Sequence, residues 1–166
     1  MRILMVGGGC RGLDLTRDLA ADGHAIRVVT RDETRRAEIE EAGGQPWIGD
    51  PDRIGTLRYA LDNVTLLLWL LGTASGPADK VAALHGSRLN MMLERTTDST
   101  VRGVIYEAAG TVPAEAFVTG TAEIELANRM NEIPYALLTA DPADRPAWLA
   151  AAHAAIDGLL QPRSVA

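Results

Sequence analysis

Three glycines near the amino terminus have the spacing of a turn that binds a pyrophosphate. Gly7, Gly9 and Gly12 form a G-x-G-x-x-G pattern directly after an apolar run. In such a turn the first glycine permits the bend, the second lets the backbone approach the phosphates, and the third brings a helix close to the sheet. Free N–H groups at the helix start then face the phosphate charge. With Cys10 and Arg11 between the glycines, this turn is predicted to bind a dinucleotide. The alternatives are a tight turn without a ligand and a turn that binds another nucleotide-like ligand.

The residues after the second apolar run bear on which dinucleotide is bound. Thr30 ends that run, at the place where an acidic residue would bond the ribose hydroxyls and repel a 2′-phosphate. Arg31 follows and Arg35 lies one helical turn further on. Guanidinium groups bind phosphate through paired hydrogen bonds, so the pattern favours NADP(H), with NAD as the other candidate. A solvent-exposed, arginine-rich helix start is the interpretation without function.

Apolar segments of strand length alternate with helical patterns six times, which predicts the elements that position these residues. The predicted strands cover residues 2–6, 25–30, 45–48, 64–71, 101–106 and 135–139. The predicted helices cover residues 11–22, 33–42, 53–61, 78–95, 113–131 and 143–160. This alternation predicts an α/β fold with a three-layer, doubly wound parallel sheet of order 3-2-1-4-5-6 and a ligand crevice outside strands one and four. Residues 1–160 are predicted to form one Rossmann domain, and residues 161–166 a frayed tail.

Several segments together resemble a known family. The glycine turn, the segment 29–32 and the pair Gly49-Asp50 resemble the atypical and extended short-chain dehydrogenase/reductases, which bind NAD(P) and include NmrA-like and epimerase-like members. The resemblance covers residues 1–106. It implies that Asp50 lies near the adenine, for which a helix-entry turn is the alternative. Val6 stands where the extended members often have a glycine.

The loop after the fourth predicted strand adds Gly72 and Thr73 to the predicted cofactor site. With Ser75, Thr73 could bond a ribose or the nicotinamide amide, and loop capping is the alternative. Cys10 in the glycine turn is a reactive thiol or, more simply, a small space-filling side chain.

No catalytic residue is predicted with a defined role. Short-chain reductases typically use a Tyr-x-x-x-Lys pair, and no tyrosine of this chain has a lysine four residues later. Glu107, after the fifth predicted strand, is a weak candidate for a general acid or base. The alternative for Glu107 is a solvated loop carboxylate or a helix cap.

Composition excludes several classes of protein. The net charge of −6 and the lack of a dense basic patch argue against nucleic-acid binding. No segment approaches the length of a membrane span, and no signal peptide is seen, so a cytoplasmic protein is expected. The single cysteine fits a reducing compartment, and the three scattered histidines predict no metal site.

Three functions remain open from the sequence. The first is an NADPH-dependent reductase or isomerase of atypical type, which would be a homodimer if it assembles as the extended family does. The second is a dinucleotide-binding or redox-sensing module without turnover, which the missing Tyr/Lys pair and the short segment after Thr139 favour. The third is a protein that uses the same turn to bind S-adenosylmethionine.

Overall fold

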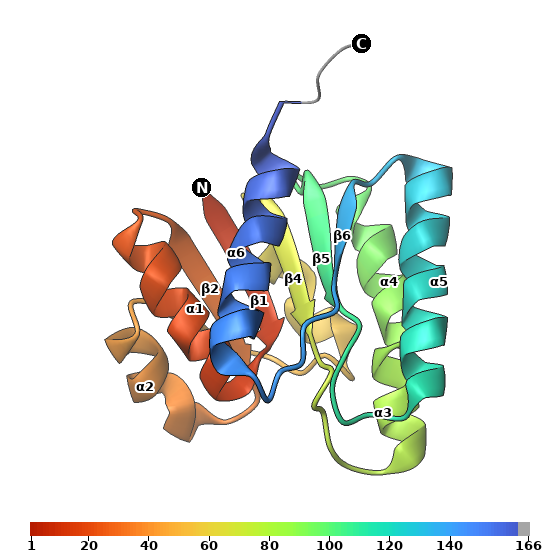
Figure 1. The fold of residues 1–166 in the computed structure, drawn as a ribbon, viewed down its shortest axis with the longest axis horizontal. Helices are drawn as coiled ribbons and strands as arrows, with labels where there is room; N and C mark the ends of the chain where they lie inside the picture. The colour runs from red at the N-terminus through yellow and green to blue at the C-terminus, as the bar shows by residue number, and fades with distance from the viewer. Residues whose placement is uncertain (163–166) are drawn as a thin grey trace.

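The computed structural model describes residues 1–162 and shows a six-stranded parallel sheet between two layers of helices (Figure 1). The strands are β1 (Arg2–Gly7), β2 (Ala25–Thr30), β3 (Gln45–Ile48), β4 (Leu66–Leu70), β5 (Gly103–Glu107) and β6 (Tyr135–Leu138). The helices are α1 (Gly9–Ala21), α2 (Arg36–Glu41), α3 (Ala78–Leu84), α4 (Ser87–Thr96), α5 (Ala114–Asn131) and α6 (Arg145–Leu160), with 3-10 segments η1 (Glu33–Arg35) and η2 (Ile54–Leu61).

The strand order is β3-β2-β1-β4-β5-β6, and every neighbouring pair runs parallel. This confirms the predicted fold class and strand order. The chain continues to one side of β1 through β2 and β3 and to the other side through β4, so the crevice between β1 and β4 is the topological switch point where ligands bind in such sheets. Of the tail predicted to fray, residues 163–166 lie outside the described part of the chain.

The central strands of the sheet are buried on both faces because most of their residues are apolar. Alternation along β1 sends Ile3 and Met5 towards α1, α2 and α6, whereas Leu4 and Val6 face η2, α4 and α5. All five residues of β4 are buried. Figure 1 shows α1 and α6 together on one face, with α4 and α5 on the other. A continuous apolar run is typical of a strand covered on both faces, and this explains why β4 could be predicted without alternation.

The single helix predicted over residues 78–95 is wrong. Two helices, α3 and α4, occupy this segment. Residues 85 and 86 separate them, and the backbone of Gly86 is not helical (φ −122°, ψ −105°). The buried residue of α3, Val81, packs against Val112 and Ala116, whereas the buried residues of α4 pack against the sheet. The predicted helices 33–42 and 53–61 are also partly corrected, since η1 and η2 are 3-10 segments.

Among the helices of residues 1–162, none combines the length and the apolar character needed to cross a bilayer.

Candidate functional site

A groove of about 390 Å³ lies at the carboxyl ends of β1, β2, β3 and β4. It coincides with the crevice predicted from the strand order. The residues that line it and were predicted to bind the cofactor are Gly7, Thr30, Arg31, Arg35, Asp50 and Thr73. The end of β1 at Gly7 and the loop after β4 therefore meet at one site, as expected for a nucleotide groove.

The glycine turn has the backbone that the spacing predicts. Gly7 has a φ of 83°, and a Cβ there would collide with the carbonyl group of Leu70 on β4. A Cβ on Gly12 would lie 3.1 Å from the sulfur of Met5, so this glycine lets α1 approach the sheet. The N–H group of Gly12 donates to the carbonyl of Gly8 at 2.9 Å, which leaves the preceding N–H groups without helical acceptors.

The β2 end of the groove carries an exposed cation. Arg31 lines the groove, and no ion pair is recorded for it within residues 1–162. Arg35 also lines the groove, but its guanidinium group pairs with Glu38. Thr30 is buried and accepts a hydrogen bond from the N–H group of Asp32 at 3.1 Å, which orders the start of the turn. Of the two arginines predicted here, Arg31 is therefore the one free to bind a ligand phosphate.

The opposite wall of the groove combines acidic residues with a lysine. Asp50 accepts a hydrogen bond from the N–H group of Asp52 at 2.9 Å, so it both lines the groove and orders its own turn. The ammonium of Lys80, which was not predicted, lies 3.7 Å from the carboxylate of Asp52 and also lines the groove. Lys80 belongs to no sequence motif. It lies at the site because α3 packs beside the loop that follows β3.

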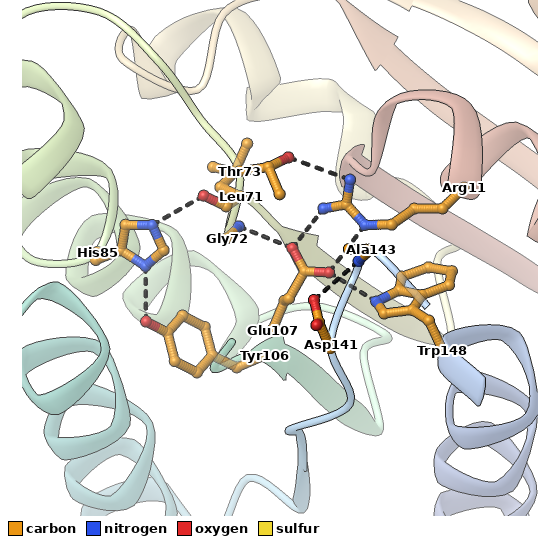
Figure 2. Close-up of polar contacts among 10 residues, drawn as sticks. All are labelled: Arg11, Leu71, Gly72, Thr73, His85, Tyr106, Glu107, Asp141, Ala143 and Trp148. Atoms are coloured by element: carbon orange, nitrogen blue, oxygen red, sulfur yellow. Dashed lines mark hydrogen bonds and ion pairs between the residues drawn. The ribbon is translucent and has the colours of Figure 1, made fainter. Parts of the chain in front are cut away.

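A buried ion pair joins the glycine turn to β5 beneath this groove (Figure 2). The guanidinium of Arg11 donates to both carboxylate oxygens of Glu107, at 2.6 and 3.0 Å, and to the hydroxyl of Thr73 at 3.1 Å. Glu107 also accepts from the N–H group of Gly72 and from the indole N–H of Trp148, both at 2.8 Å. Helices α1 and α6, strand β5 and the loop after β4 thus meet at one carboxylate.

These contacts bear on the acid–base role considered for Glu107. The side chain is fully buried, and each oxygen accepts two N–H donors. Such a carboxylate has no proton to donate, and its acceptor positions are already occupied. The alternative of a solvated loop carboxylate is wrong, because Glu107 is the last residue of β5 and has no exposure. The arrangement supports a structural role for Glu107.

Not every predicted residue lines the groove. Gly9 and Cys10 form the exposed start of α1, and Arg11 and Gly72 lie below the groove in the ion-pair network. Trp148 was not expected in this region. It lies 41 residues from Glu107, and nothing in the local sequence connects the two positions.

A second buried polar pair lies between the sheet and the break that separates α3 from α4. His85 contacts the hydroxyl of Tyr106 through Nδ1 at 2.7 Å and the carbonyl of Leu71 through Nε2 at 3.0 Å. A carbonyl can only accept, so Nε2 carries the proton and Nδ1 accepts from the tyrosine. Burial lowers the pKa of His85 and raises the pKa of Tyr106, whose ionisation the charge of Glu107 disfavours further. Both groups are therefore neutral, and the contacts of His85 are those of a buried structural side chain.

The free energy of unfolding is expected to fall as the pH drops below about 6.5, the ordinary pKa of histidine. The pKa of His85 is lower in the folded state, so the unfolded chain takes up a proton that the folded chain does not. The contribution is at most about 1.4 kcal/mol per pH unit. Urea unfolding of the wild type and of His85→Gln between pH 7.5 and 5.5 measures it. The variant should lose the extra slope, and identical slopes would contradict the assignment.

No protein-family model and no curated protein matches this sequence. Solved structures do match it. UDP-glucuronic acid 4-epimerase from Bacillus cereus, in complex with NAD, is 13% identical over 85% of this chain and 56% of its own, with a TM-score of 0.70. A short-chain dehydrogenase/reductase superfamily protein from Agrobacterium tumefaciens with bound NAD is 16% identical over 82% and 48% of the two chains, with a TM-score of 0.68.

The enzyme WbmG from Bordetella bronchiseptica, in complex with NAD, is 20% identical over 82% of this chain and 52% of its own, with a TM-score of 0.63. This chain thus spans about half the length of the solved proteins that it matches. At these identities the likeness concerns the architecture of the sheet and its helices. The chain has the Rossmann-type fold that these NAD-bound proteins share.

Proposed function

We propose that the chain binds NADP(H) in the groove at the carboxyl ends of β1 to β4, as a relative of the short-chain dehydrogenase/reductases. The observation that carries the proposal is Arg31, an exposed cation that lines the groove at the end of β2 and for which no ion pair is recorded within residues 1–162. A 2′-phosphate on the adenine ribose would find its counter-charge there. The NAD bound to proteins of the same fold supports a nicotinamide dinucleotide as the ligand class.

The shape of the surface supports a ligand longer than a mononucleotide. A second hollow of about 430 Å³, with a mostly apolar lining, shares Ala74, Ser75 and Val81 with the groove. Its other walls come from α3 and from the residues before and within the first turn of α5. An adenosine in the groove and a ring in the second hollow would be joined by a diphosphate near the glycine turn.

Arg31→Ala is expected to weaken NADPH binding by roughly tenfold or more, the usual loss for a charge-assisted hydrogen bond, and to change NADH binding little. Titration calorimetry with both cofactors measures the two affinities. Arg36→Ala is the matched control, because Arg36 pairs with Glu33 at the surface and does not line the groove. Equal losses for NADPH and NADH would refute the phosphate role, and no binding of either cofactor by the wild type would refute the proposal.

Binding without turnover is the second candidate function. It is favoured by the saturation of Glu107 by four donors and by the lack of a Tyr-x-x-x-Lys pair in the sequence. An NADPH-dependent reductase would need another proton donor near the second hollow. Screening NADPH oxidation against small carbonyl compounds distinguishes the two, since sustained turnover excludes a pure sensor. S-adenosylmethionine, titrated in parallel, tests the third function.

A further inference from the structure

The side chain of Arg11 lies where a ligand diphosphate would pass. A Cβ built on Gly9, the glycine at which the backbone approaches phosphate in such turns, would have one neighbour within 4 Å, the Nη1 atom of Arg11 at 3.8 Å. The same Nη1 donates to the hydroxyl of Thr73, which lines the groove. The space over Gly9 is therefore bordered by a guanidinium group on the side of β4.

Glu107 determines how that guanidinium group is oriented. It accepts from Nε and Nη2 of Arg11, which is the two-point contact that fixes the plane of an arginine. The indole of Trp148 covers the pair, with the guanidinium carbon 5.4 Å from the ring centre. Because the carboxylate is also held by Gly72 and Trp148, the orientation of Arg11 is set by the sheet and by α6 and not by solvent.

The contact from Arg11 to Thr73 is the weakest of the three and the one that faces the groove. Arginine has five N–H groups, and three of those on Arg11 have recorded partners within residues 1–162. Thr73 is exposed, whereas Glu107 is fully buried. A phosphate oxygen is a stronger acceptor for a guanidinium than a hydroxyl group is, so a diphosphate could replace Thr73 while both bonds to Glu107 remain.

We infer that Arg11 binds the diphosphate of the dinucleotide through Nη1 in exchange for the Thr73 hydroxyl, and that Glu107 is the positioning residue that holds the guanidinium for this exchange. The inference rests on the proposed function, because it requires a dinucleotide in the groove. It assigns the side chain of Arg11 a part that the glycine spacing does not provide, since that spacing implies backbone contacts. The diphosphate would thus be bound by Arg11, whereas the 2′-phosphate would be bound by Arg31.

The test is titration calorimetry of Arg11→Lys with NADPH and with adenosine 2′-monophosphate, which has the 2′-phosphate but no diphosphate. Lysine retains a charge for Glu107 but lacks the planar fork. We expect NADPH binding to weaken by roughly tenfold to a hundredfold and adenosine 2′-monophosphate binding by less than about threefold. Arg17→Lys, an exposed position on the same helix, is the matched control and should leave both affinities unchanged.

The double variant Arg11→Met/Glu107→Gln removes both buried charges, so it tests the inference without leaving either charge uncompensated. It should show the same selective loss of NADPH binding, with cooperative thermal unfolding as the check of folding. Equal losses for the two ligands, or wild-type NADPH affinity in either variant, would overturn the inference while leaving the proposed function standing. If the wild type binds no nicotinamide dinucleotide, the proposed function fails and the inference fails with it.

Discussion

Glu107→Gln is expected to lower the free energy of unfolding by about 3 to 5 kcal/mol, the usual cost of breaking a buried ion pair on one side. The substitution is nearly isosteric, but it leaves the charge of Arg11 buried at 8% exposure without a counter-ion. In either orientation the amide N–H groups of a glutamine would also face a donor of Arg11, together with the N–H group of Gly72 or of Trp148, because Glu107 contacts only donors. The loss therefore combines an uncompensated charge with opposed donors.

Urea unfolding of the single and double variants measures this effect. Arg11→Met/Glu107→Gln should be more stable than Glu107→Gln alone, because the double variant contains no uncompensated charge. The double-mutant cycle then gives the coupling energy of the pair. Additive losses, with the double variant the least stable of all, would show that Arg11 and Glu107 do not depend on each other.

Gly120→Ala is expected to destabilise the fold by about 3 kcal/mol, at the upper end for overpacking of a core. A Cβ at position 120 on α5 would lie far closer than van der Waals contact to the Tyr106 hydroxyl and to the ring carbon that bears it. Tyr106 cannot move aside without losing its hydrogen bond to His85, and both side chains are fully buried. The clash is therefore expected to disturb the hydrogen bond between Tyr106 and His85, which connects β5 to the segment between α3 and α4.

Gly158→Ala is the matched control, because it makes the same chemical change inside a helix. A Cβ at position 158 on α6 would have no neighbour within 4 Å. Since alanine favours a helix over glycine, this variant should gain up to about 1 kcal/mol. Thermal melts of both variants should shift in opposite directions, and a wild-type melting temperature for Gly120→Ala would contradict the packing described for α5.

The end of the groove formed by β2 and β3 could largely be predicted because its signals are local. Strands β2 and β3 begin and end where the apolar runs do, and Asp32 accepts from the N–H group of Thr34 at the start of the next helical segment, as its type and position suggest. Thr30 and Arg31 line the groove because Thr30 ends, and Arg31 directly follows, a strand whose place in the sheet was predicted.

The break between α3 and α4 could not be predicted from periodicity. Apolar residues continue at helical spacing through the segment, and the cause of the break lies on other elements. His85 is held by the carbonyl of Leu71 on the loop after β4 and by the hydroxyl of Tyr106 on β5. The residues next to His85 in the sequence do not indicate that it has these partners.

By itself the sequence determined the class of fold, the order of the strands and the glycine turn that faces the crevice, because strand and helix periods and backbone-permissive glycines are properties of neighbouring residues. Only the tertiary structure decided that Arg11 and Glu107, 96 residues apart, form a buried pair beneath that turn. Their meeting depends on β1, β4 and β5 lying side by side in register, with α6 covering the end of β5. A contact between α1 and the end of β5 depends on the packing of the whole sheet, and the spacing of the two residues in the sequence does not indicate it.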